Sequence, residues 1–344
     1  MTTVNAVATH AGVSAQTVSR VLRGSGYVSA VTRAKVLASV EALGYRPNAV
    51  GQALRSARTK MVGLIVSDVT NPFYARLRRA VEGVLGAEGL SLMLLNTGDD
   101  AVTEQKQLDL AHSYRPSGFL IAPAVGSTLT ADGLKELGTC VLISRTLDGI
   151  DVPTVVTNEA EVTRAATGEL LRAGHRDVLA VLGFAGTSTT GRREEGYRAA
   201  MQAAGLRPCV RYTDQTRPAA RAAVTEALRA SPAVTGIVAF NEPVTLGALG
   251  AMHDLGLSCP DDVSLIGFTD APWMELFHPP VTAVSQPVEE LGKRAAQLLM
   301  DLIAGRDPGE VHPVVPSRLI VRQSVTAPRA SHGTNSTRKD GPRL

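Results

Sequence analysis

The residues best suited to recognition chemistry lie near the N-terminus, in the run Ala15-Gln16-Thr17-Val18-Ser19-Arg20. A helix over this run turns Gln16 and Arg20 to the same side, because residues four apart are neighbours on a helix surface. A glutamine amide can pair bidentately with adenine and an arginine guanidinium with guanine, while the methyl group of Ala15 can meet a thymine methyl. These residue types at this spacing predict contacts with base edges in a DNA major groove.

Flanking helices must hold that helix in place, and the sequence predicts them. Residues 4–11 carry apolar side chains at helical spacing, and Gly12 can adopt the left-handed conformation that turns the chain. Ser14 is a good N-cap for the second helix, Ala15–Leu22, and a third helix is expected from about Ser29 to Leu43. Two short helices joined by a glycine turn, with a third to complete the core, form a helix-turn-helix module.

The charge distribution favours a polyanionic partner for this N-terminal head alone. The chain of 344 residues has a formal net charge of +3. Residues 1–60 hold eight Lys and Arg but one acid, a net charge of +7, whereas residues 61–324 carry −7. A three-helix module of this size can also serve protein interaction, but the charge and the exposed Gln/Arg pair favour DNA. Arg33 is then placed to neutralise a phosphate.

Beyond the head, the pattern changes to apolar runs that alternate with helical segments. Strands are expected at 62–66, 90–95, 118–122, 140–144 and 154–157 in a first series, and at 178–183, 236–240, 264–268 and 283–286 in a second. Continuous apolar strands with crossover helices imply parallel sheets covered on both faces. Two series of similar length predict two doubly wound α/β lobes, with a ligand at the carboxyl ends of the strands.

No motif indicates catalysis, a metal or a cofactor. The chain has no P-loop, no nucleophile elbow and no HExxH, and the run Gly183–Thr187 fails the dinucleotide fingerprint. Its three cysteines are far apart, which suggests neither a zinc site nor a disulfide framework. No apolar run reaches the roughly 18 residues of a membrane span, and the start lacks the pattern of a secretion signal. We therefore expect a cytoplasmic binding protein without contact to a membrane, rather than an enzyme or a secreted solute-binding protein.

The head, linker and body together resemble the LacI/GalR family of bacterial transcription regulators over residues 3–325. The motifs that carry the resemblance are Val7-Ala8, Ala11-Gly12-Val13-Ser14-Ala15-Gln16-Thr17-Val18-Ser19-Arg20-Val21-Leu22, Tyr45-Arg46-Pro47-Asn48-Ala49-Val50, Asn71-Pro72-Phe73-Tyr74, Gly174-His175 and Asp262-Val263-Ser264-Leu265-Ile266-Gly267-Phe268. The resemblance implies a repressor that binds a palindromic double-stranded operator as a homodimer, with affinity modulated by a small molecule between the lobes. The DNA-binding residues it implies are Ala15, Gln16, Thr17, Ser19, Arg20, Arg33, Asn48, Leu54 and Arg55. Leu54 would be the wedge that opens the central base step, with Arg55 beside it.

The resemblance also implies a domain organisation and an oligomeric state. It places the helix-turn-helix domain at 1–46, a hinge helix at 47–59 and a two-lobed body, similar to periplasmic binding proteins, at 60–325. The first lobe would comprise about 60–158 and 288–318, and the second about 159–287 and 319–325. The tail 326–344 is polar and is expected to be disordered. It has no leucine heptads, so we expect a dimer.

The effector residues carried over by resemblance are Asn71, Phe73, Asn158, Thr187, Thr189, Arg193, Asn241, Asp270, Trp273 and Gln286. Arg193 is the best anchor, because a guanidinium suits sugar hydroxyls or a carboxylate; the alternative is a surface ion pair with Glu194 or Glu195. The family usually has aspartates where this chain has Thr157 and Thr269. Asp270 and Glu161 are candidates to replace them. The loss of both aspartates weakens the expectation of a standard sugar effector, and a phosphorylated sugar, a nucleoside or an atypical polyol stays open as the effector.

Overall fold

The computed structural model describes residues 2–23, 26–45 and 59–329. By its internal contacts the chain divides into two compact units, Met1–Lys60 and Met61–Leu344. Of the predicted hinge only Thr59 lies within the described residues, and of the predicted tail only residues 326–329. Asn48, Leu54 and Arg55 lie outside them.

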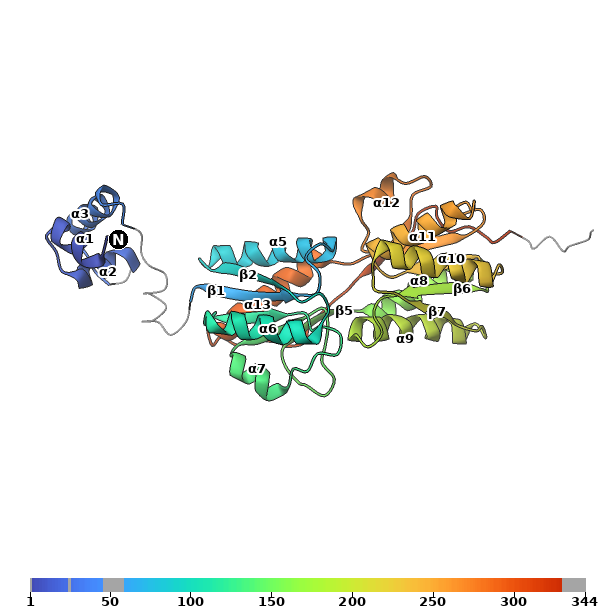
Figure 1. Cartoon of the computed structure of the whole chain (residues 1–344), viewed down its shortest axis with the longest axis horizontal. Coiled ribbons are helices and arrows are strands. Elements are labelled where there is room, and N and C mark those ends of the chain that lie inside the picture. The colour runs from blue at the N-terminus through green and yellow to red at the C-terminus, as the bar shows by residue number, and fades with distance from the viewer. Residues whose placement is uncertain (1, 24–25, 46–58, 330–344) are drawn as a thin grey trace, which may run out of the picture. The chain divides into compact units, whose positions relative to one another are not determined.

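The N-terminal unit is a bundle of the three predicted helices, α1 (Val4–Ala11), α2 (Ala15–Arg23) and α3 (Ala30–Ala42) (Figure 1). Gly12 ends α1 with a φ of 65°, the left-handed conformation expected of it. The Ser14 hydroxyl accepts a hydrogen bond from the amide of Thr17 at 3.1 Å, which caps α2. Val7, Val18 and Val36, one from each helix, are fully buried at the centre.

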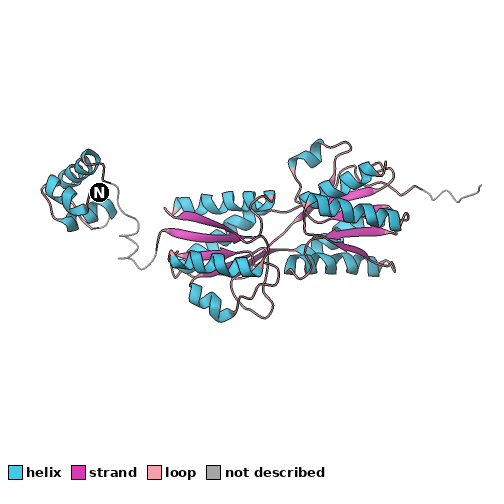
Figure 2. Ribbon diagram, viewed as in Figure 1, coloured by secondary structure: helices cyan, strands magenta, loops and turns pink. Residues whose placement is uncertain are grey.

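The second unit contains two lobes, each built around a six-stranded sheet with helices on both faces (Figure 2). The first sheet has the order β11-β5-β4-β3-β1-β2 and is parallel throughout. Its strands are β1 (Met61–Val66), β2 (Ser91–Asn96), β3 (Gly118–Ile121), β4 (Cys140–Ile143), β5 (Thr154–Thr157) and β11 (Val314–Val315). One face packs on α5 (Pro72–Ala87) and α13 (Val288–Ile303), and the other on α6 (Ala101–Ser113) and α7 (Ala131–Leu137).

The second sheet has the order β12-β10-β9-β8-β6-β7, and β12 is its one antiparallel strand. Its strands are β6 (Val178–Leu182), β7 (Cys209–Tyr212), β8 (Gly236–Ala239), β9 (Ser264–Phe268), β10 (Thr282–Ser285) and β12 (Arg318–Ile320). Helices α8 (Glu159–Arg172) and α9 (Ser188–Ala203) cover one face, and α10 (Arg217–Ala230) and α11 (Glu242–Asp254) cover the other. A short helix, α12 (Pro272–Leu276), lies between β9 and β10.

The chain passes between the lobes three times, after β5, after β10 and between β11 and β12 (Figure 1). The third crossing comes slightly earlier than the sequence interpretation placed it. Arg318 was assigned to the first lobe, but it already pairs with Ser285 in the second sheet. Among the described residues, no helix is both long and apolar enough to cross a membrane.

Buried His175 joins the second lobe to the end of the described chain. Its Nδ1 lies 2.8 Å from the Thr235 hydroxyl, and its Nε2 lies 2.9 Å from the carbonyl oxygen of Thr326. Burial lowers the pKa of His175, because the charged ring is poorly solvated there. The neutral ring satisfies both contacts when Nε2 donates to the carbonyl and Nδ1 accepts from the hydroxyl.

We expect this histidine to make folding stability depend on pH. The unfolded chain binds a proton at His175 more readily than the folded chain, so its contribution is present above about pH 6.5 and is lost as pH falls below it. Urea unfolding midpoints between pH 7.5 and 5.0 measure this, and His175→Gln should flatten the slope. An equally steep slope in His175→Gln would assign the effect to other groups.

Candidate functional site

The exposed face of α2 carries the predicted base-reading residues. Gln16 and Arg20 are both exposed, while Val18 and Val21 of the same helix point into the head. The structure therefore presents the amide and the guanidinium together on one open surface. Arg33 of α3 is exposed as well.

The other predicted DNA-binding residues of α2 are half-buried or take part in the helix cap. Ala15 is half-buried and packs against the core of the head, so its methyl group faces outward only in part. The Thr17 hydroxyl lies 2.9 Å from that of Ser14 and belongs to the helix cap. Ser19 is half-buried. Gln16 and Arg20 are thus the side chains of α2 best placed to extend toward base edges.

In the second unit, the carboxyl ends of the two sheets are joined directly. The amide of Thr146, in the loop after β4, donates to the hydroxyl of Ser188 at the start of α9, at 2.8 Å. Three residues near these ends, Ser144, Thr269 and Asp270, have φ values of 68°, 79° and 34°. Left-handed backbone at residues other than glycine costs energy and clusters at functional sites.

Arg193 is the centre of a buried polar network on the second-lobe side. Its Nε donates to Oε2 of Glu159 at 2.6 Å and its Nη2 to Oε1 at 3.2 Å. Its Nη1 donates to the carbonyl oxygen of Phe240 at 2.8 Å, and the guanidinium lies 5.1 Å from the centre of the Phe268 ring. Arg193 does form an ion pair, but with Glu159 on α8 rather than with Glu194 or Glu195. Adjacent residues on one helix do not face each other, and Arg193 instead points across to α8.

The Glu159 carboxylate accepts two further hydrogen bonds, from Thr157 and from Gln286. The Thr157 hydroxyl donates to Oε1 at 2.6 Å, and Nε2 of Gln286 donates to Oε1 at 2.9 Å. The Thr269 hydroxyl in turn donates to Oε1 of Gln286 at 3.1 Å. Burial alone would raise the pKa of Glu159, but Arg193 and the other donors outweigh it and hold the pKa below its usual value. Glu159 is thus ionised within the network, and its charge is paired with that of Arg193.

The close packing of α8 on α9 brings Arg193 and Glu159 together. A Cβ atom on Gly196 would collide with the backbone carbonyl of Ala160, so glycine lets the two helices approach. Arg193 lies one turn before Gly196, and Glu159 directly precedes Ala160.

We expect Gly196→Ala to destabilise the protein by about 1–3 kcal/mol, because the added methyl group overpacks the helix contact. Gly191→Ala is the matched control, since that position of α9 has open space around it, and it should be neutral or slightly stabilising. Chemical denaturation compares them. Equal stability of the two variants would contradict the role given to Gly196.

Several other predicted polar residues act as helix caps at the strand ends. Asn71 accepts from the amide of Phe73 at 3.0 Å, Thr187 from Thr190 at 3.2 Å, and Asn241 from Val244 at 2.7 Å. The Thr189 hydroxyl lies 3.3 Å from that of Thr187. Asn158 does not cap its helix, but accepts from the amide of Ser317 at 2.7 Å. Asn158 thereby ties the first crossing between the lobes to the third.

The remaining predicted residues are engaged within their own lobes. Asp270 pairs with Arg322 at 2.7 Å. The indole nitrogen of Trp273 donates to Glu242 at 2.9 Å, and Phe73 is buried against Tyr74 in the first lobe. Glu161 accepts from Asn158 at 3.2 Å. Neither Asp270 nor Glu161 belongs to the Arg193 network.

A second buried cation, not found from the sequence, lies at the carboxyl ends of the first sheet. Arg145 forms a bidentate pair with Asp99 and also donates to the carbonyl of Pro123 at 2.7 Å. Glu104 lies close to it and accepts from the amide of Ala124 at 2.6 Å. Although burial opposes the charge, Tyr74, Asp99 and Glu104 together raise the pKa of Arg145. The sequence signal was weak, because Arg145 and Asp99 follow different strands and Glu104 lies in α6.

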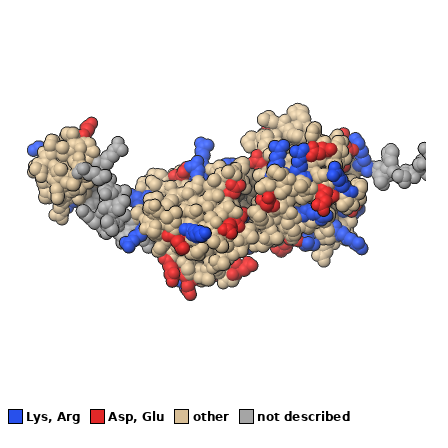
Figure 3. Space-filling model, in the orientation of Figure 1, with Lys and Arg blue, Asp and Glu red and all other residues tan. Residues whose placement is uncertain are grey.

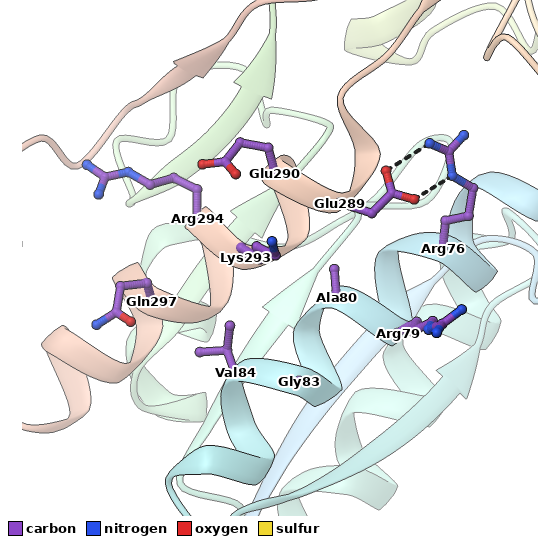
Figure 4. Close-up of a pocket in the computed structure, with 10 residues that line it drawn as sticks. All are labelled: Arg76, Arg79, Ala80, Gly83, Val84, Glu289, Glu290, Lys293, Arg294 and Gln297. Atoms are coloured by element: carbon purple, nitrogen blue, oxygen red, sulfur yellow. Dashed lines mark hydrogen bonds and ion pairs between the residues drawn. The ribbon is translucent and has the colours of Figure 1, made fainter.

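A surface groove between α5 and α13 is a separate feature. Arg76 and Glu289 form an ion pair at 2.8 Å at one end of it (Figure 4). None of the predicted effector residues lines this groove. Acidic and basic side chains are intermixed on the face of the body seen in Figure 3.

Comparisons with known proteins agree with both units. Residues 3–48 match the family of bacterial regulatory proteins, lacI family, and residues 167–325 match a periplasmic binding protein-like domain. The ribose operon repressor of Halalkalibacterium halodurans is 30% identical over 324 residues, which cover 94% of this chain and 97% of the relative. The regulator GalR of Escherichia coli is 30% identical over 342 residues, covering 98% and 100%.

Solved structures show the same architecture. The structure of the transcriptional regulator CelR in complex with cellobiose has a TM-score of 0.69 at 31% identity, covering 94% of this chain and 100% of CelR. A Lac repressor dimer bound to operator and an anti-inducer shares the fold, with a TM-score of 0.83 at 23% identity over 95% and 99% of the two chains. The head, the two-lobed body and these relatives establish that the chain belongs to the LacI family of bacterial regulatory proteins and is a DNA-binding transcriptional regulator.

Proposed function

We propose that this protein is a cytoplasmic repressor whose operator affinity is controlled by a carbohydrate-like ligand bound between the lobes. The observation that carries the proposal is the combination, in one chain, of a head exposing Gln16 and Arg20 with a body whose two sheets are joined at their carboxyl ends. Such a body suits ligand sensing, because a ligand that prefers one arrangement of the lobes shifts the population toward it. The role we propose is binding, without catalysis.

The operator would be palindromic, because a homodimer presents two heads related by twofold symmetry. Helix-turn-helix dimers contact half-sites about one helical turn apart, with the N-terminal part of the second helix at the base edges. The hinge at 47–59, with Leu54 as the wedge and Arg55 beside it, remains part of this proposal.

The ligand class is supported by both the relatives and the site. One relative is a ribose operon repressor, and CelR has been solved with cellobiose. In this chain, Arg193 and the amides and hydroxyls of Asn158, Thr187, Thr189, Asn241 and Gln286 gather at the strand ends of the second lobe and at the crossings beside them. Phe73 and Trp273 are the apolar surfaces proposed to pack on a ring.

The test is a titration of an operator complex with a panel of mono- and disaccharides, sugar phosphates and nucleosides. A true effector should change operator affinity about 5- to 150-fold, the usual range of allosteric coupling. The double variant Glu159→Gln/Arg193→Gln, which leaves neither charge of the pair buried alone, should remove that response while leaving operator binding without ligand in place. A response that survives in the double variant would move the site elsewhere.

A further inference from the structure

Three arginines whose guanidinium groups lie near the facing strand ends are each paired with an acid. In the described part of the chain, Arg145 after β4 pairs with Asp99, Arg193 with Glu159, and Arg322 with Asp270 after β9. No free positive charge is therefore offered by these three side chains. This matters for the ligand, because a phosphate or carboxylate group is bound best by an arginine whose charge is available.

We propose that Glu159 is a positioning residue that sets the charge selectivity of the ligand site: it neutralises Arg193, so that the site accepts uncharged hydroxyl-rich ligands and rejects anions. This inference rests on the proposed function, since it concerns the same ligand site. It places a determinant of ligand specificity at Glu159. This position differs from Thr157 and Thr269, where the resemblance to the family leads one to expect aspartates.

The exposed fractions of the two side chains support a role for Arg193 in contacting the ligand and a role for Glu159 as the more deeply buried partner of Arg193. The Arg193 side chain is 13% exposed, whereas that of Glu159 is 2% exposed. Of the two partners, Arg193 is thus the one whose side chain has surface left for a ligand to contact. Three of the five N–H groups of Arg193 are already engaged. The other two remain for ligand hydroxyl oxygens.

An anion bonded to the two remaining N–H groups would face the negative charge of Glu159 across the same guanidinium, and it could take the full positive charge only by displacing that carboxylate. Displacing the carboxylate would leave it ionised and buried, with only Thr157 and Gln286 as donors, which is strongly unfavourable. A neutral hydroxyl group makes no such demand, because it bonds to the free N–H groups and leaves the pair intact. The Glu159 carboxylate therefore discriminates against anions without contacting the ligand. It repels an anion and competes with it for the Arg193 guanidinium.

Inorganic phosphate is the probe that tests this directly. We would titrate the full-length wild type, Glu159→Gln, Arg193→Gln and the double variant by calorimetry at constant ionic strength. The basic head also attracts phosphate, so the informative quantity is the binding that depends on Arg193. Glu159→Gln should gain a saturable site, at least tenfold tighter than any Arg193-dependent binding in the wild type, and the double variant should lose it.

Glu161→Gln is the matched control. Glu161 lies on the same helix two residues further on and bonds to Asn158 rather than to Arg193. It should behave as the wild type, because a mere change in net charge on α8 does not free the guanidinium. An equal gain in Glu161→Gln, or no gain in Glu159→Gln, would overturn the proposal.

A comparison of the wild type with Arg193→Gln also tests the inference, should Glu159→Gln fail to fold. Saturable phosphate binding that is present in the wild type and absent in Arg193→Gln would show that Glu159 does not block anions. Operator binding is measured separately on the wild type. Its failure would overturn the proposed function, whereas the phosphate result concerns only the role of Glu159.

Discussion

The double variant Gln16→Ala/Arg20→Ala is expected to lose its preference for the operator over unrelated DNA. Each bidentate contact to a base contributes about 1–3 kcal/mol of discrimination. Loss of both should lower the specificity ratio roughly 30-fold to 10⁴-fold. Both side chains are exposed on α2 and away from the core, so the head should stay folded. Competition binding with operator and random DNA measures the ratio.

Arg33→Ala is the control for this experiment. Arg33 is exposed on α3 and is predicted to contact phosphates, which position the protein without reading sequence. This variant should bind all DNA more weakly and show a shallower salt dependence, with its specificity ratio retained. If the double variant kept full operator preference, α2 would not be the recognition helix.

The variant Arg145→Met is expected to lose about 3–5 kcal/mol of folding stability, because it leaves buried Asp99 without its counter-ion. The side chains of Arg145 and Asp99 are only 6% and 7% exposed, so water cannot replace the arginine. Glu104, whose pKa is already raised by burial, also loses a compensating charge. Urea unfolding by circular dichroism measures the loss.

Arg78→Ala provides the comparison for an exposed pair. Arg78 and Glu82 form an ion pair on the surface of α5, with side chains 39% and 42% exposed. Pairs of this kind contribute about 0.3–0.5 kcal/mol. A loss in Arg145→Met no larger than that in Arg78→Ala would contradict the view that the Arg145 pair stabilises the facing ends of the sheets.

Most of the fold was predictable because its signals are local. The three head helices have caps and glycine turns in the sequence, and the nine expected strands are near-continuous apolar runs. Of the strands that the structure describes, three were missed because each is short or lacks such a run, and Val314–Val315 has only two residues. Cys209–Tyr212 is an edge strand that contains an arginine, and Arg318–Ile320 pairs antiparallel at the opposite edge. Edge strands need less apolar surface, so their pattern is weaker.

Several candidate residues lie near the strand ends, where the sequence placed them, but their hydrogen-bond partners could not be predicted. Arg193 was identified as the anchor, yet its partner was sought among its sequence neighbours. The true partner, Glu159, is 34 residues away and is placed there by the contact of Gly196 with Ala160. Helix packing, rather than any local motif, decides this contact. An acid in the first turn of a helix beside Asn158 was the one signal that could have indicated it.

The most direct test of the account is the selection of fragments bound by the purified protein from the genome of its source. The account predicts enrichment of one pseudo-palindrome, with a central CG step where Leu54 would insert, and loss of that enrichment in the Gln16→Ala/Arg20→Ala variant. Salt-sensitive binding without any enriched sequence would contradict it, because the head would then be a basic tether and not a reader of operator DNA.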